Sequence, residues 1–349
     1  NLVAPNLMYK DYSGDFVQGK GAKIQVRKPV VLTADEFDEV EGTQVQDINE
    51  TSVEVTLDKL ATVDVAFSAI EIATNIDDLN RVFIEPAAVA LAQKINSDGL
   101  ALYADIPYAV GEANVTPSSL DDIAAARKML NQNKVPVTPR NAIWDTEADA
   151  KFTTIPAIVN AEKSGSTAAL REGSIGRIFG MDNYMSQSVK RHTTGITSAT
   201  ATKVNGAVSE GATQLSIDGT TLTGKLVKGD ILLIEGNSYV VLQDSADAAT
   251  NAIANIQVYP ALPAIKDNTD VTVVGNHTAN LAFHPSAFAF VTRPLAAPSG
   301  VESYVTSYNG VTLRVVKGYD MTHKKDMLSM DVLYGYKTMY PELAARIMG

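Results

Sequence analysis

The chain has 349 residues, 45% of them apolar and 20% charged, a balance typical of globular proteins and unlike that of disordered chains. Its 40 acidic and 29 basic residues give a net charge of −11, which argues against nucleic-acid binding through clustered Lys and Arg. The absence of Cys excludes disulfides, thiolate nucleophiles and Cys-based metal sites. No apolar run approaches the roughly 18 residues of a transmembrane helix, and the opening NLVAPNLMYK has no signal-peptide pattern, so we expect no membrane association.

Residues 1–20 show no sustained periodicity and predict an extended N-terminal arm that needs a neighbour to be ordered. Residues 21–72 alternate between apolar and polar side chains on either side of an acid-rich loop (35–41), which predicts a long two-stranded β-ribbon. Such a ribbon is marginal alone in water, so we expect it to pack on another copy of the chain. The predicted inter-subunit contacts are Ile24, Val26, Val53, Val55, Val63, Val65 and Phe67.

Residues 73–105 carry the strongest helical pattern. Thr74 or Asn75 can cap the helix, and Asp77 and Asp78 fall in its first turn. Pro86 should start or kink the main helix, which from residue 86 to 104 would be about 28 Å long at 1.5 Å per residue. We expect this Ala-rich helix to be a structural spine.

Residues 106–192 predict a mixed α/β domain. A helix starts at Ser118 or Ser119, each followed three residues later by an Asp that can complete a capping box. A strand over 141–144, a short helix over 147–152 and a strand over 181–189 follow.

Residues 193–278 are rich in Thr, Ala, Gly, Ser and Val and contain five candidate strands separated by turn signals. They predict a small all-β barrel or sandwich, inserted into the α/β chain with its two ends close in space. The mixed domain continues over 279–310, and residues 311–349 predict C-terminal strands interrupted by a turn at Lys317–Gly318. The fold class is therefore α+β with an inserted β-barrel domain.

We find no pattern of residues that carries catalysis. The four histidines His192, His277, His284 and His323 lack metal-ligand spacing, and we expect them on the surface or in loops. No HExxH, GxSxG, P-loop or GxGxxG motif occurs, and Asp77–Asp78 and Asp121–Asp122 lie where helix N-termini favour acids. The sequence predicts no enzyme, no metal and no cofactor.

The order of these parts resembles the tailed-bacteriophage major capsid fold of the Hong Kong 97 type. The resemblance rests on the spine IEPAAVALAQKINSDGLALYAD (84–105) and on VPVTPRNAIWDTEADAKF (135–152). LREGSIGRIFGMDNYMSQSV (170–189) and AFHPSAFAFVTRPL (282–295) complete it. The β module at about 193–278 is similar to the insertion domain of the Salmonella phage coat-protein family of the P-twenty-two type.

This resemblance implies a coat protein that assembles with itself into pentamers and hexamers of an icosahedral shell around double-stranded DNA. Scaffolding protein and portal are implied partners during assembly in the host cytoplasm, and the virion is the implied final location. The ribbon would lie over an adjacent subunit, the mixed axial domain would meet its copies at capsomer centres, and the spine helix with the C-terminal strands would form a peripheral domain. The insertion would project outward.

Two other readings compete with this one. A secreted or surface β-rich structural protein of the adhesin type fits the β module and the absence of Cys, but not the spine helix. A hydrolase with an acidic active site is the third, and it would need a concave acidic pocket. Particle size separates the readings, because only a shell protein predicts megadalton particles or capsomers.

Overall fold

The computed structural model describes residues 2–15, 23–28, 52–68, 83–160, 165, 168–308, 310–323 and 325–349. These residues belong to two compact units. Unit 1 comprises Asn1–Tyr9, Asn75–Phe288 and Tyr340–Gly349, and unit 2 comprises Lys10–Thr74 and Ala289–Met339. The expected helix cap at Thr74 or Asn75 and the acid-rich loop at 35–41 lie outside the described residues.

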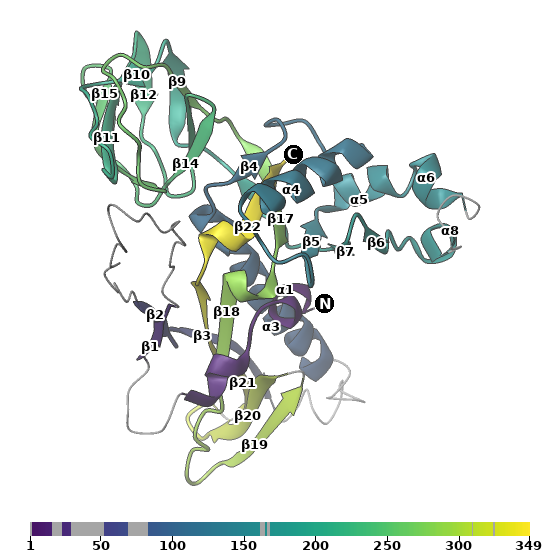
Figure 1. The fold of residues 1–349 in the computed structure, drawn as a ribbon. Helices are drawn as coiled ribbons and strands as arrows, with labels where there is room; N and C mark the ends of the chain where they lie inside the picture. Colours follow the sequence, from purple (N-terminus) through teal and green to yellow (C-terminus); the bar gives the residue numbers. More distant parts are fainter. Residues whose placement is uncertain are drawn as a thin grey trace, which may run out of the picture. The chain divides into compact units, whose positions relative to one another are not determined.

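Unit 1 is built on a mixed seven-stranded sheet (Figure 1). Its strands, in order across the sheet, are β4 (Ala109–Val110), β22 (Ala344–Met348), β17 (His277–Phe283), β5 (Asn141–Trp144), β7 (Met181–Met185) and β6 (Arg177–Ile178), and β8 (Arg191–His192) also pairs with β17. The pairs β4–β22 and β5–β7 are parallel, and the others are antiparallel.

The helices of unit 1 surround this sheet in sequence order. They are α1 (Val3–Leu7), α3 (Glu85–Leu100) with the 3-10 turn η3 (Ala101–Asp105), α4 (Leu120–Gln132), α5 (Thr146–Phe152), α6 (Pro156–Val159), α8 (Ala168–Glu172) and the short 3-10 turns η4 (Pro285–Ala287) and η5 (Pro341–Leu343). Helix α4 begins where the sequence predicts, because Ser119 and Asp122 form the expected capping box. Its buried side chains join Trp144 and Phe152, whose rings meet edge to face with centroids 4.7 Å apart.

Residues 193–276, here called the central β segment, are also part of unit 1. A six-stranded sheet contains, in order, β10 (Lys203–Val204), β11 (Gln214–Asp218), β15 (Ala252–Tyr259), β14 (Asn237–Val241), β13 (Ile231–Ile234) and β16 (Val271–Val273), and β9 (Ile196–Thr200) pairs with β12 (Thr221–Gly224). Side chains from these strands form one hydrophobic cluster of their own, which includes Leu215, Ile217 and Leu232. The five strands predicted here are each present within a few residues of their expected positions.

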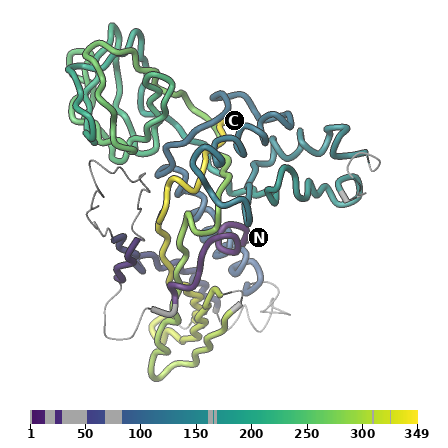
Figure 2. Tube along the Cα trace, viewed as in Figure 1, coloured from purple at the N-terminus to yellow at the C-terminus, as the bar shows by residue number. Residues whose placement is uncertain are grey.

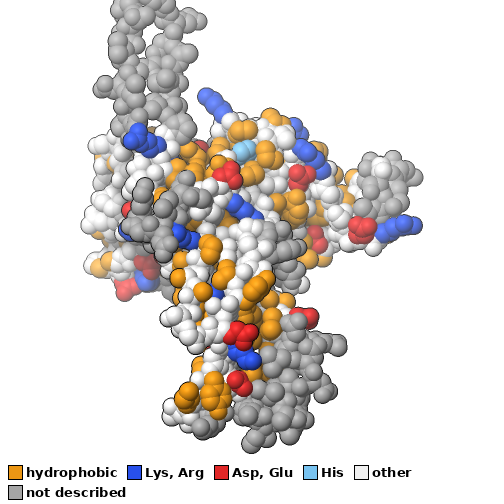
Figure 3. All heavy atoms as spheres, turned by 90° about the horizontal axis from the view of Figure 1, so that it is seen from below, with side chains coloured by type: hydrophobic (Ala, Val, Ile, Leu, Met, Phe, Trp, Pro, Cys, Tyr) orange, Lys and Arg blue, Asp and Glu red, His pale blue; other side chains and the backbone are white. Residues whose placement is uncertain are grey.

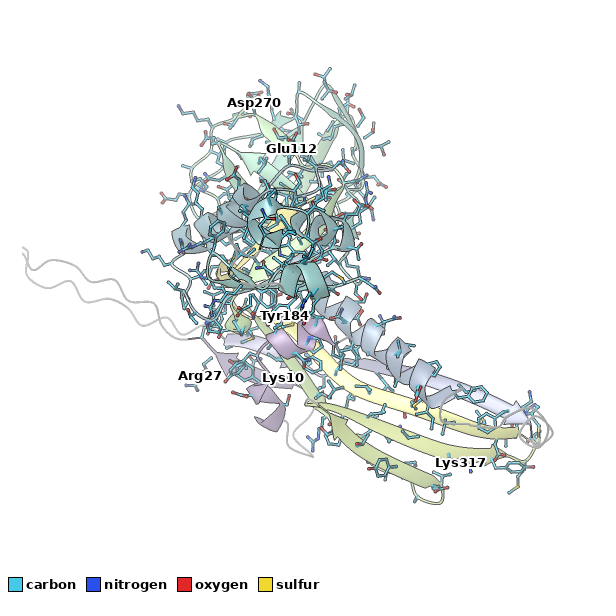
Figure 4. All side chains as sticks on the ribbon, turned by 90° about the vertical axis from the view of Figure 1, so that its right-hand side faces the viewer. Lys10, Arg27, Glu112, Tyr184, Asp270 and Lys317 are labelled. Carbon is cyan, nitrogen blue, oxygen red and sulfur yellow. The ribbon has the colours of Figure 1, made fainter. Side chains whose placement is uncertain are left out.

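Unit 2 contains a five-stranded antiparallel sheet and a separate two-stranded pair. The sheet consists of β18 (Phe288–Arg293), β21 (Lys325–Thr338), β20 (Val311–Asp320) and β19 (Glu302–Tyr308) in that order, with β3 (Lys59–Ser68) paired along β21; the two-stranded pair is β1 (Lys23–Arg27) with β2 (Ser52–Thr56), and η1 (Asp11–Asp15) is a 3-10 turn. Figure 4 shows Lys317 on the long strands and Arg27 at the end of β1.

Three local predictions differ from the structure. The turn expected at Lys317–Gly318 is wrong, because β20 continues to Asp320 with Gly318 paired to Met327. The N-terminal arm is not extended over residues 3–7, which form α1. Ala4 is buried there, and its amide donates to Asn96 Oδ1 of α3 at 2.8 Å.

The boundaries of the units also differ from the expected domains. Residues 289–310, expected in the mixed domain, belong to unit 2, because β18 pairs with β21. Residues 340–349, expected with the C-terminal strands, belong to unit 1, because β22 lies between β4 and β17. Residues 59–68 pair with β21 and therefore do not continue the two-stranded ribbon formed by β1 and β2.

Candidate interaction surface

The β1–β2 pair has one apolar and one polar face. Its antiparallel register places Ile24 opposite Val55 and Val26 opposite Val53, so these four predicted contact residues share a face. On the other face, Lys23 Nζ lies 2.7 Å from Glu54 Oε1. The alternation read from the sequence is therefore present in the structure.

The other three predicted contact residues lie on β3. Val63 pairs with Met330, Val65 with Leu328 and Phe67 with Asp326, which puts the three side chains on one face of the unit 2 sheet. Leu328 and Met330 are buried on this face, so it forms part of the apolar interior of unit 2.

The seven residues differ in how much surface they expose to another molecule. Val55 is 0% and Phe67 4% exposed, and both are covered by their own chain. Ile24, Val26, Val53, Val63 and Val65 are half-buried and keep accessible apolar surface.

Unit 2 exposes further apolar side chains that sequence reasoning missed. Tyr304 is 68%, Tyr319 52% and Met321 78% exposed, and Val305 and Met327 also lie at the surface. In the view of Figure 3, hydrophobic side chains lie between polar ones on the face shown. The sequence signal was weak, because two of these residues flank the misplaced turn at 317–318.

Unit 1 has an apolar groove of about 510 Å³ between α6, α8 and β6. Ile158, Ile175 and Ile178 contribute to its lining, and Phe179 stands beside it with a φ of 50°, in the left-handed region. Leu170 of α8 is also exposed. The glycines at 173, 176 and 180 were read as turn residues, which left these apolar neighbours unnoticed.

The histidines do not all lie where the sequence predicted. His192 and His277 are buried, which makes the expectation of surface or loop positions wrong for these two. They lie together because β8 and β17 pair directly, with His192 opposite His277. Burial lowers the pKa of His277 to about 4, so its ring is neutral near pH 7.

A buried carboxylate and a buried guanidinium accompany these histidines. Asp230 Oδ1 lies 2.7 Å from His192 Nε2, and Arg346 Nη1 lies 3.4 Å from His277 Nε2. No sequence spacing links residues 192, 230, 277 and 346, so only the fold reveals the cluster.

Within the described ranges, no group of three or more His, Asp or Glu residues could hold a metal ion. No helix there is long and apolar enough to cross a bilayer. The geometry of the described residues therefore directs attention to surfaces for protein contact.

Comparisons with known proteins agree with this emphasis. No protein-family model and no curated protein matches the sequence. Solved structures do match over nearly the full chain. A structure of Mycobacterium phage Che8 aligns with 99% of this chain and 90% of its own, with a TM-score of 0.59 and 18% identity.

Two further matches are capsid structures by title. The asymmetric unit of the bacteriophage PhiM1 mature capsid covers 100% of this chain and 87% of its own, with a TM-score of 0.55 and 11% identity. The capsid structure of the Cyanophage P-SCSP1u covers 98% and 86%, with a TM-score of 0.53 and 11% identity. The chain has a fold shared with phage capsid structures, which confirms the predicted capsid fold at this level.

Proposed function

We propose that this chain is the major capsid protein of a tailed phage, a structural subunit that assembles with itself into an icosahedral shell and catalyses no reaction. The observation that carries the proposal is the agreement of fold over nearly the whole chain with capsid structures. An adhesin-like surface protein is not favoured, because it does not account for this agreement.

The fold is proposed to be of the Hong Kong 97 type, with the central β segment as an inserted all-β domain. Support for the insertion comes from its own hydrophobic cluster and from the direct pairing of β8 with β17 at its two ends. We propose that this domain projects outward, and that the mixed part of unit 1 meets its copies at the centres of pentamers and hexamers.

The proposed partners follow from the shell. Residues 1–20 and 21–72 act as arm and ribbon that contact neighbouring subunits, with scaffolding protein and portal as partners in the host cytoplasm before the protein resides in the virion. The enclosed DNA is held without sequence-specific contacts, since the net charge of −11 disfavours phosphate binding.

The seven predicted contact residues remain part of this proposal, and the five half-buried ones have surface to offer. Val26 is suited to a test because the adjacent Gln25 lies on the opposite, polar face of β1. The same new side chain can therefore be introduced on either face.

The test is assembly of purified full-length protein, measured by sedimentation over a range of concentrations. Val26→Asn removes about 1 kcal/mol of apolar burial per contact and should raise the concentration needed for assembly about fivefold to tenfold. Gln25→Asn is the matched control and should assemble like the unaltered chain.

Circular dichroism of the unassembled variants verifies that both fold. If Val26→Asn folds and assembles like the control, the proposed role of the β1–β2 face is wrong. If the unaltered chain forms neither particles nor rings of five or six subunits, the proposed function itself is wrong.

A further inference from the structure

The chain leaves and re-enters the seven-stranded sheet of unit 1 at a single place. Strand β8 ends at His192 just before the central β segment, and β17 begins at His277 just after it, and the two residues are paired (Figure 2). Whatever holds these two strands also holds the base of the segment.

His192 links this base to a turn of the segment and to η3. Its Nε2 lies 2.7 Å from Asp230 Oδ1, and its Nδ1 lies 3.1 Å from the Tyr103 hydroxyl. The other carboxylate oxygen of Asp230 accepts the amide of Val227 at 2.7 Å. Both oxygens of Asp230 therefore already have partners, and the carboxylate is fully buried.

Arg346 of β22 supplies the second link. Its fully buried guanidinium donates through Nη1 to the Gly229 carbonyl at 2.7 Å and through Nη2 to the Tyr103 carbonyl at 2.5 Å. The guanidinium carbon also lies 4.9 Å from the centre of the Tyr103 ring. Gly229 has a φ of +97°, and an added Cβ would lie 3.0 Å from the Ala104 Cβ, so the turn approaches η3 as closely as only glycine allows.

His277 completes the cluster, and its two contacts define its protonation state. Nδ1 lies 2.8 Å from the Gly275 carbonyl, so this nitrogen must carry a hydrogen. Nε2 faces Arg346 Nη1 at 3.4 Å, and a guanidinium nitrogen can only donate, so Nε2 must accept. Only the neutral ring with hydrogen on Nδ1 satisfies both neighbours.

We propose that this cluster is an acid-sensitive latch, in which a proton on His277 Nε2 separates the base of the central β segment from Arg346 and η3. The added proton would place N–H against N–H and a second positive charge beside the buried guanidinium. Asp230 cannot offset that charge, because His192 and the Val227 amide already occupy its oxygens.

The charges facing His277 come from every element packed around it. Arg346 lies on β22, His192 on β8, and Asp230 in the turn before β13. Asp105 of η3 lies near Arg346 but forms an ion pair at 2.7 Å with Lys228. The described surroundings thus hold no uncommitted carboxylate to receive a protonated His277.

The direction of the pH effect follows from the pKa of His277. Burial lowers this pKa from 6.5 to about 4, so the latched form holds fewer protons than the open form in this range. The latch is therefore fully stable above pH 6.5 and weakens as the pH falls towards 4. With these two values, the equilibrium constant for opening rises about 30-fold between pH 7.5 and pH 5.0.

The test is hydrogen exchange of the unassembled full-length chain at these two pH values, corrected for the intrinsic pH dependence of exchange. Peptides covering 227–231 and 344–349 report the latch, and β11 and β15 serve as internal references. The latch peptides should lose protection about 30-fold at pH 5.0, while the references change little. His277→Gln keeps an acceptor towards Arg346 but cannot titrate, so its latch should not respond to acid.

Two control variants make the assignment specific. His323→Gln changes an exposed histidine of unit 2 and should leave the acid response intact. A response that persists in His277→Gln but disappears in His192→Gln would overturn the assignment to His277. The absence of any response in the unaltered chain would overturn the latch.

A second measurement avoids the risk that His277→Gln does not fold. With only four histidines in the chain, the ring signals can be followed by NMR in the unaltered protein. A ring of His277 that stays neutral to about pH 4 supports the latch, whereas titration near 6.5 contradicts it. Both measurements are independent of shell assembly, so their failure would leave the proposed function untouched.

Discussion

Gly335 of β21 is the position where we expect the smallest change to have a large effect in unit 2. A Cβ added there would overlap the Thr56 carbonyl oxygen and lie 3.0 Å from the Thr56 carbonyl carbon and 3.1 Å from Val291 Cγ2. Two of these neighbours are backbone atoms, which cannot rotate away as a side chain can. Gly335→Ala should therefore force β2 away from β21, at a cost of about 1–3 kcal/mol for overpacking.

The assay is hydrogen exchange of residues 325–338, because a local loss of 1–3 kcal/mol corresponds to exchange about 5- to 150-fold faster. Gly318→Ala is the matched control: Gly318 lies in β20 of the same sheet, and an added Cβ there meets nothing within 4 Å. This control should be neutral or slightly protective, since alanine favours a strand over glycine. Equal exchange in the two variants would refute the close contact between β2 and β21.

Two other changes test local features of the units. Ser119→Ala removes the capping box of α4 and should lower the free energy of unfolding by about 1 kcal/mol, as measured by Trp144 fluorescence, whereas Ser118→Ala should not; an equal loss in both would argue against the cap. Arg314→Met leaves the buried carboxylate of Asp331 without its guanidinium partner and should cost about 1–3 kcal/mol, seen as faster exchange along β21; unchanged exchange would mean that the pair contributes little.

Local patterns in the sequence predicted the local structure well. The capping box at Ser119 and the strand over 141–144 depend on neighbouring residues alone, and both are present in the structure. The alternation at 63, 65 and 67 also identified one face of a strand correctly. Period and capping are short-range properties, so one sequence suffices to detect them.

Features set by distant residues could not be predicted in the same way. The pairing of β3 with β21 joins residues more than 250 positions apart, and the alternation of either strand fits several partners. Gly318 was read as a turn because glycine favours turns, but pairing with Met327 keeps it in the strand. His192 and His277 were expected at the surface for want of local partners, and their real partners lie on other elements.

The first residues illustrate the same limit in the candidate interaction surface. The sequence of residues 3–7 has no clear helical period, and α1 depends on Asn96 of α3 to bind the Ala4 amide. The apolar residues at 304, 319 and 321 became visible only when the sheet of unit 2 defined which side chains it leaves exposed.

Electron microscopy of the purified full-length protein tests the central claim most directly. The account predicts closed shells, or rings of five and six subunits, in which each copy has the fold described here. A preparation that contains only dispersed single chains, at concentrations where phage shells form, would contradict it.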